Sequence, residues 1–270
     1  MTGDWHIHSC FSNDSETPLD VIAAKALEKG LSDICITDHT DIDLKEDGWV
    51  QDIPSYVEGL KAFKEKYKGI LNVHIGLEVG LNPDYKEEIE KHVASYPFEF
   101  VLGSTHTMQG DDPYYRMRYD MPDDEFFRVY FERCLENIKA FDCYDCCAHL
   151  DYVVRYGYDK DKYYSYEKYR EPIDEILEIL VKRGTALEVN TAGLRKGLKY
   201  VHPYPEILKT YKKMGGRRIS IGSDAHRPGD VGADIGVAVK ELYELGFTEE
   251  DINPVYWLKK IERAPSVPGQ

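Results

Sequence analysis

The sequence predicts an α/β fold in which seven parallel strands form a barrel wrapped by helices. Seven short apolar segments alternate with stretches of helical periodicity, which is the pattern of right-handed βαβ units and a parallel sheet. Residues of the kind that bind metals lie at or just past the carboxyl ends of six of these segments. An open doubly wound sheet would gather its ligands at one switch point, so this wide distribution favours a closed barrel.

The segments predicted as strands are short, apolar and bounded by polar loops. They cover residues 3–9, 32–39, 71–79, 98–106, 146–151, 185–190 and 218–224. Helical periodicity fills the intervals, between Pro18 and Gly30, over residues 54–67, 83–95, 126–138, 173–181 and 205–214, and finally over 233–245 and 254–261. No linker or composition break interrupts the pattern, so residues 1–270 are predicted to form one domain.

The first strand offers two imidazoles to one point in space. His6 and His8 lie two residues apart, so their side chains project from the same face of an extended strand. Seven further candidate ligands follow this strand or close later ones: Asp14, His39, Glu78, His106, His149, Asp224 and His226. These residue types suit zinc, iron and manganese, and nine ligands are too many for one ion. The sequence therefore predicts two or three ions that share Glu78 as a bridging carboxylate.

The composition is that of a folded protein with a strongly acidic surface. Apolar residues make up 42% of the chain, and 34 basic against 49 acidic side chains give a formal net charge of −15. Such a surface repels long nucleic acid, whereas a small anionic substrate can bind beside metal ions that reverse the local field. The N-terminus lacks the pattern of a signal peptide, and no apolar run approaches the roughly 18 residues of a membrane span. A cytoplasmic protein is therefore expected.

Seven motifs follow one another along nearly the whole chain. They are His6-Ile7-His8-Ser9, Ile36-Thr37-Asp38-His39, Gly76-Leu77-Glu78, Gly103-Ser104-Thr105-His106, His149-Leu150-Asp151, Asn190-Thr191-Ala192-Gly193-Leu194-Arg195-Lys196 and Gly222-Ser223-Asp224-Ala225-His226. This series closely resembles the polymerase and histidinol phosphatase (PHP) family, and in particular its monofunctional histidinol-phosphate phosphatase branch. The resemblance implies a distorted, TIM-like (β/α)7 barrel with a metal site at the carboxyl ends of its strands.

By motif position, the resemblance also implies three metal positions. The first would be held by His6, His8, Glu78 and Asp224, the second by Glu78, His106 and His149, and the third by Asp14, His39 and His226. Much of the wider family has a histidine where this chain has Asp14. An acidic residue at that position is similar to the histidinol phosphatase branch, so Asp14 is kept in the set.

A site of this kind indicates hydrolysis without a protein nucleophile. A hydroxide formed on a metal pair can attack phosphorus in line, while the ions neutralise charge on the phosphoryl oxygens and the leaving alkoxide. Ser9 and Ser223 are candidates for a covalent route, but neither has the sequence context of a serine hydrolase. Catalysis is therefore assigned to the residues that hold the metals, above all Glu78, Asp224 and His226.

Two arginines resemble the phosphate-binding arginines of the family, namely Arg155 and Arg195. An arginine presents a planar fork that can meet two phosphoryl oxygens at once. The alternative for each is an ordinary solvated charge. Residues 152–170 hold seven tyrosines among charged residues, which suggests a segment over the barrel mouth or, equally, a surface cover. Three other histidines, His74, His92 and His202, are interpreted as structural.

The function implied by the resemblance is hydrolysis of L-histidinol phosphate to L-histidinol and phosphate in histidine biosynthesis. One alternative is a PHP-family phosphoesterase or exonuclease that acts on nucleotides, against which the acidic charge argues. Another is a metal-dependent binding module without catalysis, against which the intact ligand set argues. The choice among zinc, iron(II) and manganese and the oligomeric state are left open by the sequence.

Overall fold

Seven main strands form one parallel sheet in the computed structural model, which describes residues 3–47 and 52–258. The strands are β1 (Gly3–Ile7), β2 (Asp33–Ile36), β3 (His39–Thr40), β4 (Asn72–Gly80), β5 (Phe100–Ser104), β6 (Cys146–Cys147), β7 (Ala186–Asn190) and β8 (Ile219–Gly222). Their order is β1-β2-β4-β5-β6-β7-β8, and the short β3 pairs with β4. The seven predicted strands are confirmed, with the second divided into β2 and β3.

The two edges of the sheet, β1 and β8, approach each other and nearly close a barrel. Ile7 forms a parallel bridge with Ala225. Backbone hydrogen bonds also run from Asp224 to the carbonyl of His6 (2.8 Å) and from His8 to the carbonyl of Ala225 (2.9 Å). The predicted barrel is thus confirmed, and its closure places Asp224 directly against the two histidines of the first strand.

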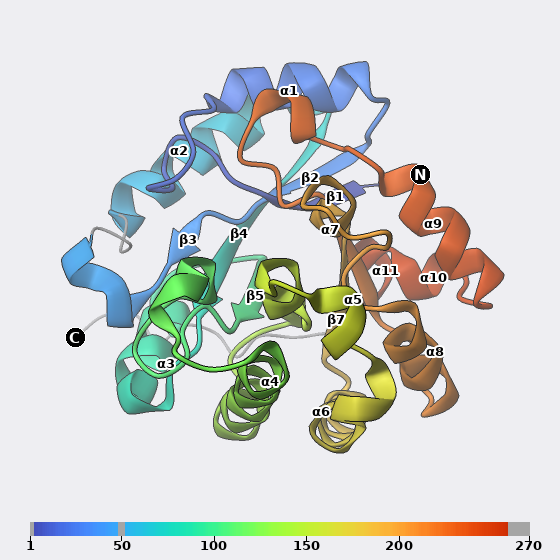
Figure 1. The fold of residues 1–270 in the computed structure, drawn as a ribbon. Coiled ribbons are helices and arrows are strands. Elements are labelled where there is room, and N and C mark those ends of the chain that lie inside the picture. The colour runs from blue at the N-terminus through green and yellow to red at the C-terminus, as the bar shows by residue number, and fades with distance from the viewer. Residues whose placement is uncertain (1–2, 48–51, 259–270) are drawn as a thin grey trace.

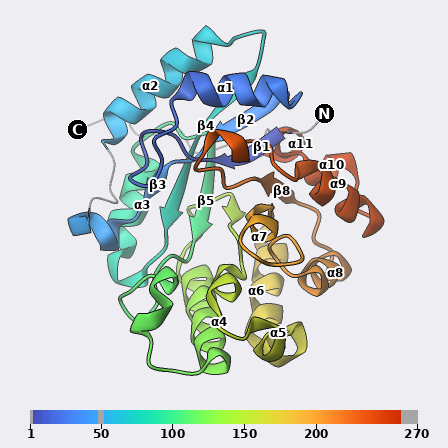
Figure 2. The ribbon, with the colours of Figure 1, turned by 45° about the horizontal axis from the view of Figure 1, so that its top comes forward.

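Helices form a layer around the outside of the sheet (Figures 1 and 2). The longer ones are α1 (Leu19–Glu28), α2 (Ile53–Lys66), α3 (Lys86–Ala94), α4 (Asp123–Ala140), α6 (Arg170–Arg183), α8 (Pro205–Lys213) and α9 (Ile235–Glu244). Short α-helices are α5 (Lys160–Tyr163), α7 (Ala192–Arg195), α10 (Glu249–Ile252) and α11 (Pro254–Leu258). The 3₁₀ segments are η1 (Ile42–Asp47), η2 (Pro83–Tyr85), η3 (Pro113–Arg118), η4 (Tyr152–Tyr156), η5 (Tyr166–Tyr169) and η6 (Pro228–Asp230), and η1 and η3 each contain a kink.

The predicted helices are present in the structure, but they begin and end at different residues from those predicted. The one expected over 83–95 is divided into η2 and α3, and residues 259–261 of the last one lie outside the described residues. Among the described residues, no helix combines the length and the apolar character needed to cross a membrane.

Helix α6 shows why the sequence folds in this way. Its apolar residues recur at helical spacing, as Ile173, Ile176, Leu177 and Leu180, and all four are buried against the sheet and the neighbouring helices. The helix ends at Gly184, whose φ of 68° is a left-handed conformation that glycine adopts without steric cost. Apolar periodicity and a glycine stop are therefore enough to place this element.

The barrel interior is divided along its axis. Phe100, Leu102 and Ser104 occupy every second position of β5, so their side chains point to the same face of the strand. The Ser104 hydroxyl donates to Glu78. Phe100 and Leu102 belong to a buried apolar cluster with Trp5 and Trp257. Apolar side chains thus fill one end of the interior, and polar side chains gather at the carboxyl ends of the strands.

Candidate metal centre

The nine side chains predicted as metal ligands lie together at the carboxyl end of the barrel. They are His6, His8 and Asp14 from β1 and its loop, His39 and Glu78 from β3 and β4, His106 and His149 from the loops after β5 and β6, and Asp224 and His226 from the loop after β8. Each has a side-chain atom within 3.5 Å of another member of the set. The barrel therefore brings the whole predicted set into one cluster.

Glu78 is buried at the centre of this cluster. Five histidine nitrogens surround its carboxylate: His149 Nε2 (2.9 Å) and His106 Nε2 (3.1 Å) at Oε1, and His6 Nε2 (3.0 Å), His39 Nδ1 (3.2 Å) and His8 Nε2 (3.3 Å) at Oε2. Burial alone would raise the pKa of the Glu78 carboxyl, but the facing imidazoles hold it well below its ordinary value. One ionised carboxylate thus faces five imidazole rings.

His8 provides a test of whether this cluster fits metal ions. The single proton of the Ser12 hydroxyl is donated to Asp38 (2.8 Å), so the Ser12 oxygen must accept from His8 Nδ1 (3.2 Å). The lone pair of a neutral His8 ring is then on Nε2, which points at Glu78 Oε2 (3.3 Å) and Asp224 Oδ1 (3.5 Å). This nitrogen is buried and has no hydrogen-bond partner among the described residues. A lone pair aimed at two carboxylates requires a cation between them, so the residues fit a metal.

Two of the rings already have the protonation that a metal ligand needs, and two do not. Burial lowers the pKa of His8 and of His39, so both rings are neutral at neutral pH, as a ligand must be. Burial would do the same to His6 and His106, but nearby carboxylates raise their pKa well above the ordinary value. These two rings hold protons in the metal-free protein that a bound ion would displace.

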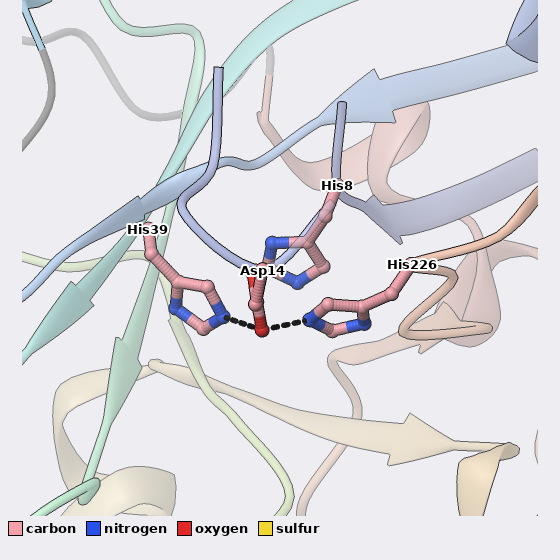
Figure 3. Close-up of side chains that lie close together, drawn as sticks. All are labelled: His8, Asp14, His39 and His226. Carbon is pink, nitrogen blue, oxygen red and sulfur yellow. Dashed lines mark ion pairs between the residues drawn. The ribbon is translucent and has the colours of Figure 1, made fainter. Parts of the chain in front are cut away.

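One group within the cluster lies at its outer side. Asp14, His39 and His226 turn toward one another, with the His8 ring beside them (Figure 3). The Asp14 carboxylate lies 2.8 Å from His226 Nε2 and 3.7 Å from His39 Nε2. The side chains of Asp14 and His226 are 34% and 28% exposed, whereas that of Glu78 is 1% exposed. The cluster is therefore open to solvent at this side.

Asp41 belongs to the centre and was missed by the sequence analysis. Its Oδ1 lies 2.6 Å from His106 Nδ1, while Nε2 of the same ring faces Glu78. Burial raises the pKa of the Asp41 carboxyl to about 6. The carboxylate thus orients the His106 ring from behind, as an acceptor beside a metal-binding histidine commonly does. Its place two residues after His39 was the available signal.

Glu188 was also missed, although it is the one charged residue in the sequence of β7. Its carboxylate contacts the His6 ring and the backbone of His149. A glutamate inside a fully buried strand needs polar partners, and this requirement was the available signal for a role of Glu188.

The two candidate phosphate-binding arginines differ in what surrounds them. The side chain of Arg155 in η4 is only 10% exposed; its Nε donates to the Tyr156 hydroxyl (2.9 Å) and its guanidinium stacks on the Tyr152 ring. Its Nη1 lies 3.7 Å from Asp224 Oδ2 and has no hydrogen-bond partner among the described residues. An unused donor therefore faces the metal cluster. The Tyr152 ring is itself centred 5.0 Å from the His149 ring, so the tyrosine-rich stretch begins beside the cluster.

Arg195, at the end of α7, is held by acidic and carbonyl groups. Its guanidinium pairs with Asp234 (3.2 Å) and Asp230 (3.4 Å). It also donates to the carbonyl of Ser223, the residue before Asp224. The arginine thus ties the loop after β8 to α7, close to the cluster.

The two serines considered for a covalent route are engaged elsewhere. Ser9 Oγ donates to Asp38 Oδ2 (2.6 Å), and Ser223 Oγ donates to Asp4 Oδ2 (2.5 Å). Since a carboxylate holds each hydroxyl proton, neither oxygen is paired with a histidine base in the way that a nucleophile requires.

The three histidines interpreted as structural have no place in the metal-type groups of the described residues. His74 pairs with Asp33 (3.2 Å), and His202 is buried with its Nδ1 2.5 Å from Asp151 Oδ1. His92 lies in α3.

A nearly closed parallel barrel with histidines and carboxylates clustered at its carboxyl end defines a metal-binding α/β barrel protein. The family model of the PHP domain matches residues 4–192, which is more than half of the chain. The chain therefore belongs to the PHP domain family, as the motifs predicted.

Its similarity to known members extends over most of the chain. It is 34% identical to the histidinol-phosphatase of Lactococcus lactis subsp. lactis over 225 residues, which cover 83% of either protein. It is also 34% identical to the probable histidinol-phosphatase of Clostridium acetobutylicum, over 97% of this chain and 98% of that one. The crystal structure of the Lactococcus histidinol phosphate phosphatase, in complex with zinc, L-histidinol and phosphate, matches with a TM-score of 0.83 and 31% identity, covering 91% of this chain and 94% of that chain.

Proposed function

We propose that the protein is a metal-dependent phosphomonoesterase that hydrolyses L-histidinol phosphate to L-histidinol and phosphate, a step of histidine biosynthesis. The observation that carries this proposal is the nine-residue cluster around Glu78. The choice of substrate is supported by the Lactococcus relative, whose structure contains L-histidinol and phosphate, the two products of this reaction.

The cluster is assigned to two or three divalent ions, which can be zinc, iron(II) or manganese. One position is built from His6, His8 and Asp224, a second from Glu78, His106 and His149, and a third from Asp14, His39 and His226 with His8 beside them. Glu78 lies within reach of all three positions, because its oxygens face rings that belong to each. Bound ions would supply an activated water and neutralise charge on the phosphoryl oxygens and the leaving alkoxide.

The residues around the cluster bind and orient the substrate. Arg155 Nη1 is the donor best placed for a phosphoryl oxygen, since it is buried, unused and directed at Asp224. Arg195 is assigned to the same phosphate, and its contacts with Asp230 and Asp234 hold it beside the loop after β8. The formal charge of −15 favours a small ester over a polynucleotide, because the surface repels a polyanion.

A panel of phosphate esters tests the proposal. Purified protein is loaded in turn with zinc, iron(II) and manganese and offered L-histidinol phosphate, nucleoside monophosphates and a short single-stranded DNA. Release of phosphate from L-histidinol phosphate should exceed that from any nucleotide by at least about tenfold in kcat/KM.

Two results would contradict the assignment. Preferred cleavage of nucleotides would indicate a phosphoesterase of different substrate class. Neither phosphate release nor cleavage of the DNA with any of the three metals, from protein shown to have bound them, would indicate a binding module.

A further inference from the structure

Glu188 is a charged side chain in the middle of β7, whose five residues are all buried. Its Oε1 lies 2.6 Å from His6 Nδ1. Its Oε2 accepts hydrogen bonds from the backbone N–H of His149 (2.7 Å) and from the side-chain amide of Asn190 (3.2 Å). Burying a carboxylate is costly unless it is hydrogen-bonded, and two of its three partners here are candidate metal ligands.

This carboxylate determines which nitrogen of His6 carries a proton. An ionised carboxylate only accepts hydrogen bonds, so the Nδ1 that faces Glu188 must be the donor. The lone pair of a neutral His6 ring is then on Nε2, directed at Glu78 Oε2 (3.0 Å) and Asp224 Oδ1 (3.8 Å). The His6 ring is thus held from behind through Nδ1 and presented to the cluster through Nε2.

The same side chain acts on two candidate metal positions. Through Oε1 it orients His6, which belongs to one group, and through Oε2 it holds the backbone of His149, which belongs to another. His6 lies in β1 and His149 follows β6, and these two strands are not neighbours in the sheet. No ladder hydrogen bond can therefore set the distance between them, whereas a carboxylate inside the barrel can.

The sequence leaves room for this contact at Gly222 of β8. A Cβ at that position would lie 2.7 Å from Glu188 Oε1 and 2.3 Å from the His6 Cβ, which is closer than such atoms approach. Glycine therefore allows the His6 side chain and the Glu188 carboxylate to meet across β8.

We infer that Glu188 is a positioning residue of the metal centre. It holds the His6 ring with Nδ1 protonated and fixes the backbone of His149, so that both imidazoles reach their ions in the correct relative position. The inference rests on the proposed metal-dependent function, and it adds a role for a residue that touches neither an ion nor the substrate.

The first test replaces the carboxylate by an amide of the same shape. Glu188→Gln offers one acceptor oxygen to three donors, so either His6 or His149 must face an NH₂ group. Zinc affinity, measured by competition with a chromophoric chelator, should fall by about 10- to 100-fold. In zinc-loaded protein, kcat should fall while KM stays within about twofold, because the phosphate contacts remain.

Asp145→Asn is the matched control. Asp145 is a buried carboxylate at the opposite end of the barrel, and it accepts a hydrogen bond from the backbone N–H of Val101 (2.8 Å). Both variants should lower the melting temperature, but only Glu188→Gln should lower zinc affinity. An equal loss of zinc affinity in the two variants, or no loss in Glu188→Gln, would overturn the inference.

A measurement on the parent chain does not depend on the folding of any variant. In zinc-loaded, uniformly ¹³C,¹⁵N-labelled protein, the NMR signal of the His6 ring, assigned through bonds from its own backbone amide, should show the proton on Nδ1. A proton on Nε2 would overturn the role of Glu188 while leaving the phosphatase proposal intact. Normal zinc binding and tautomer without hydrolysis of any ester would overturn the phosphatase proposal and leave the role of Glu188 standing.

Discussion

The two ends of strand β4 carry the same chemical pair in different surroundings. Near the amino end, His74 contacts a single carboxylate, that of Asp33 (3.2 Å), and its ring stacks on Trp5 at 4.5 Å. Near the carboxyl end, the two oxygens of Glu78 are shared by five histidine rings. Four residues along one strand separate a satisfied contact between a histidine and a carboxylate from a crowded one.

The difference teaches how to tell a structural histidine from a candidate metal ligand. Asp33 has a hydrogen-bond donor for each of its contacts, including the side chains of Ser32 and Asn72. Glu78 instead faces at least one ring, that of His8, whose inward nitrogen has no proton to give. A carboxylate surrounded by more acceptors than donors is complete only with a cation.

Removal of metal should give the largest effect at the Glu78 end. Dialysis against a chelator is expected to abolish hydrolysis of the phosphate ester, and a divalent ion should restore it, because neither Ser9 nor Ser223 is placed to act instead. When the ion is added back at a free concentration of 100 times its dissociation constant, it should also stabilise the folded protein by about 2.7 kcal/mol, which is measured as a higher melting temperature. Full turnover by protein shown by elemental analysis to be metal-free would disprove the mechanism.

Glu78→Gln sharpens the comparison without changing volume. The amide can face only some of the five rings with an acceptor, so ions should be lost from more than one position and activity should drop by more than about 100-fold. Metal stoichiometry per chain and phosphate release measure the two effects. An unchanged stoichiometry would mean that Glu78 is not shared between ions.

The arginines should give intermediate effects of different size. Arg155→Lys loses the unused Nη1 donor near Asp224, and one charge-assisted hydrogen bond is worth about 1.5–3 kcal/mol, or roughly ten- to 150-fold in kcat/KM. Arg195→Lys keeps the positive charge beside Asp230 and Asp234 but loses the planar fork of the guanidinium. It should therefore also lower kcat/KM, within the same range but by less than Arg155→Lys.

Metal content is the control for both arginine variants and should not change. Kinetics of Arg195→Lys within about twofold of the parent would show that this arginine only ties the loop after β8 to α7.

The smallest effect is expected at the amino end of β4. His74→Asn removes the contact with Asp33 and the stacking on Trp5, which should lower the free energy of unfolding by about 1 kcal/mol. Activity and metal content should stay within about twofold of the parent. A loss of metal in this variant would contradict the distinction between a structural histidine at the amino end of β4 and a metal site at its carboxyl end.

The sequence predicted the barrel and the nine clustered residues because both depend on short-range patterns. Apolar runs place each strand, and in a parallel barrel every strand end lies at the same rim, so a residue such as His106 needs no tertiary information to be recognised. Asp41 and Glu188 were missed because their importance lies in contacts with rings from other strands. The different surroundings of Arg155 and Arg195 likewise depend on loops whose packing no periodicity encodes.

The uneven exposure of the cluster has a consequence for the exchange of ions. Asp14 and His226 form its solvent-facing side, while His6 and Glu78 are buried behind them. Under the proposed assignment, ions would enter and leave past the outer position, so ions at the inner positions would be kinetically trapped even where all positions have equal affinity. Release to an excess of chelator should be biphasic, and Asp14→Asn should accelerate the fast phase first. A single phase for all ions would show that the inner positions have their own path to solvent.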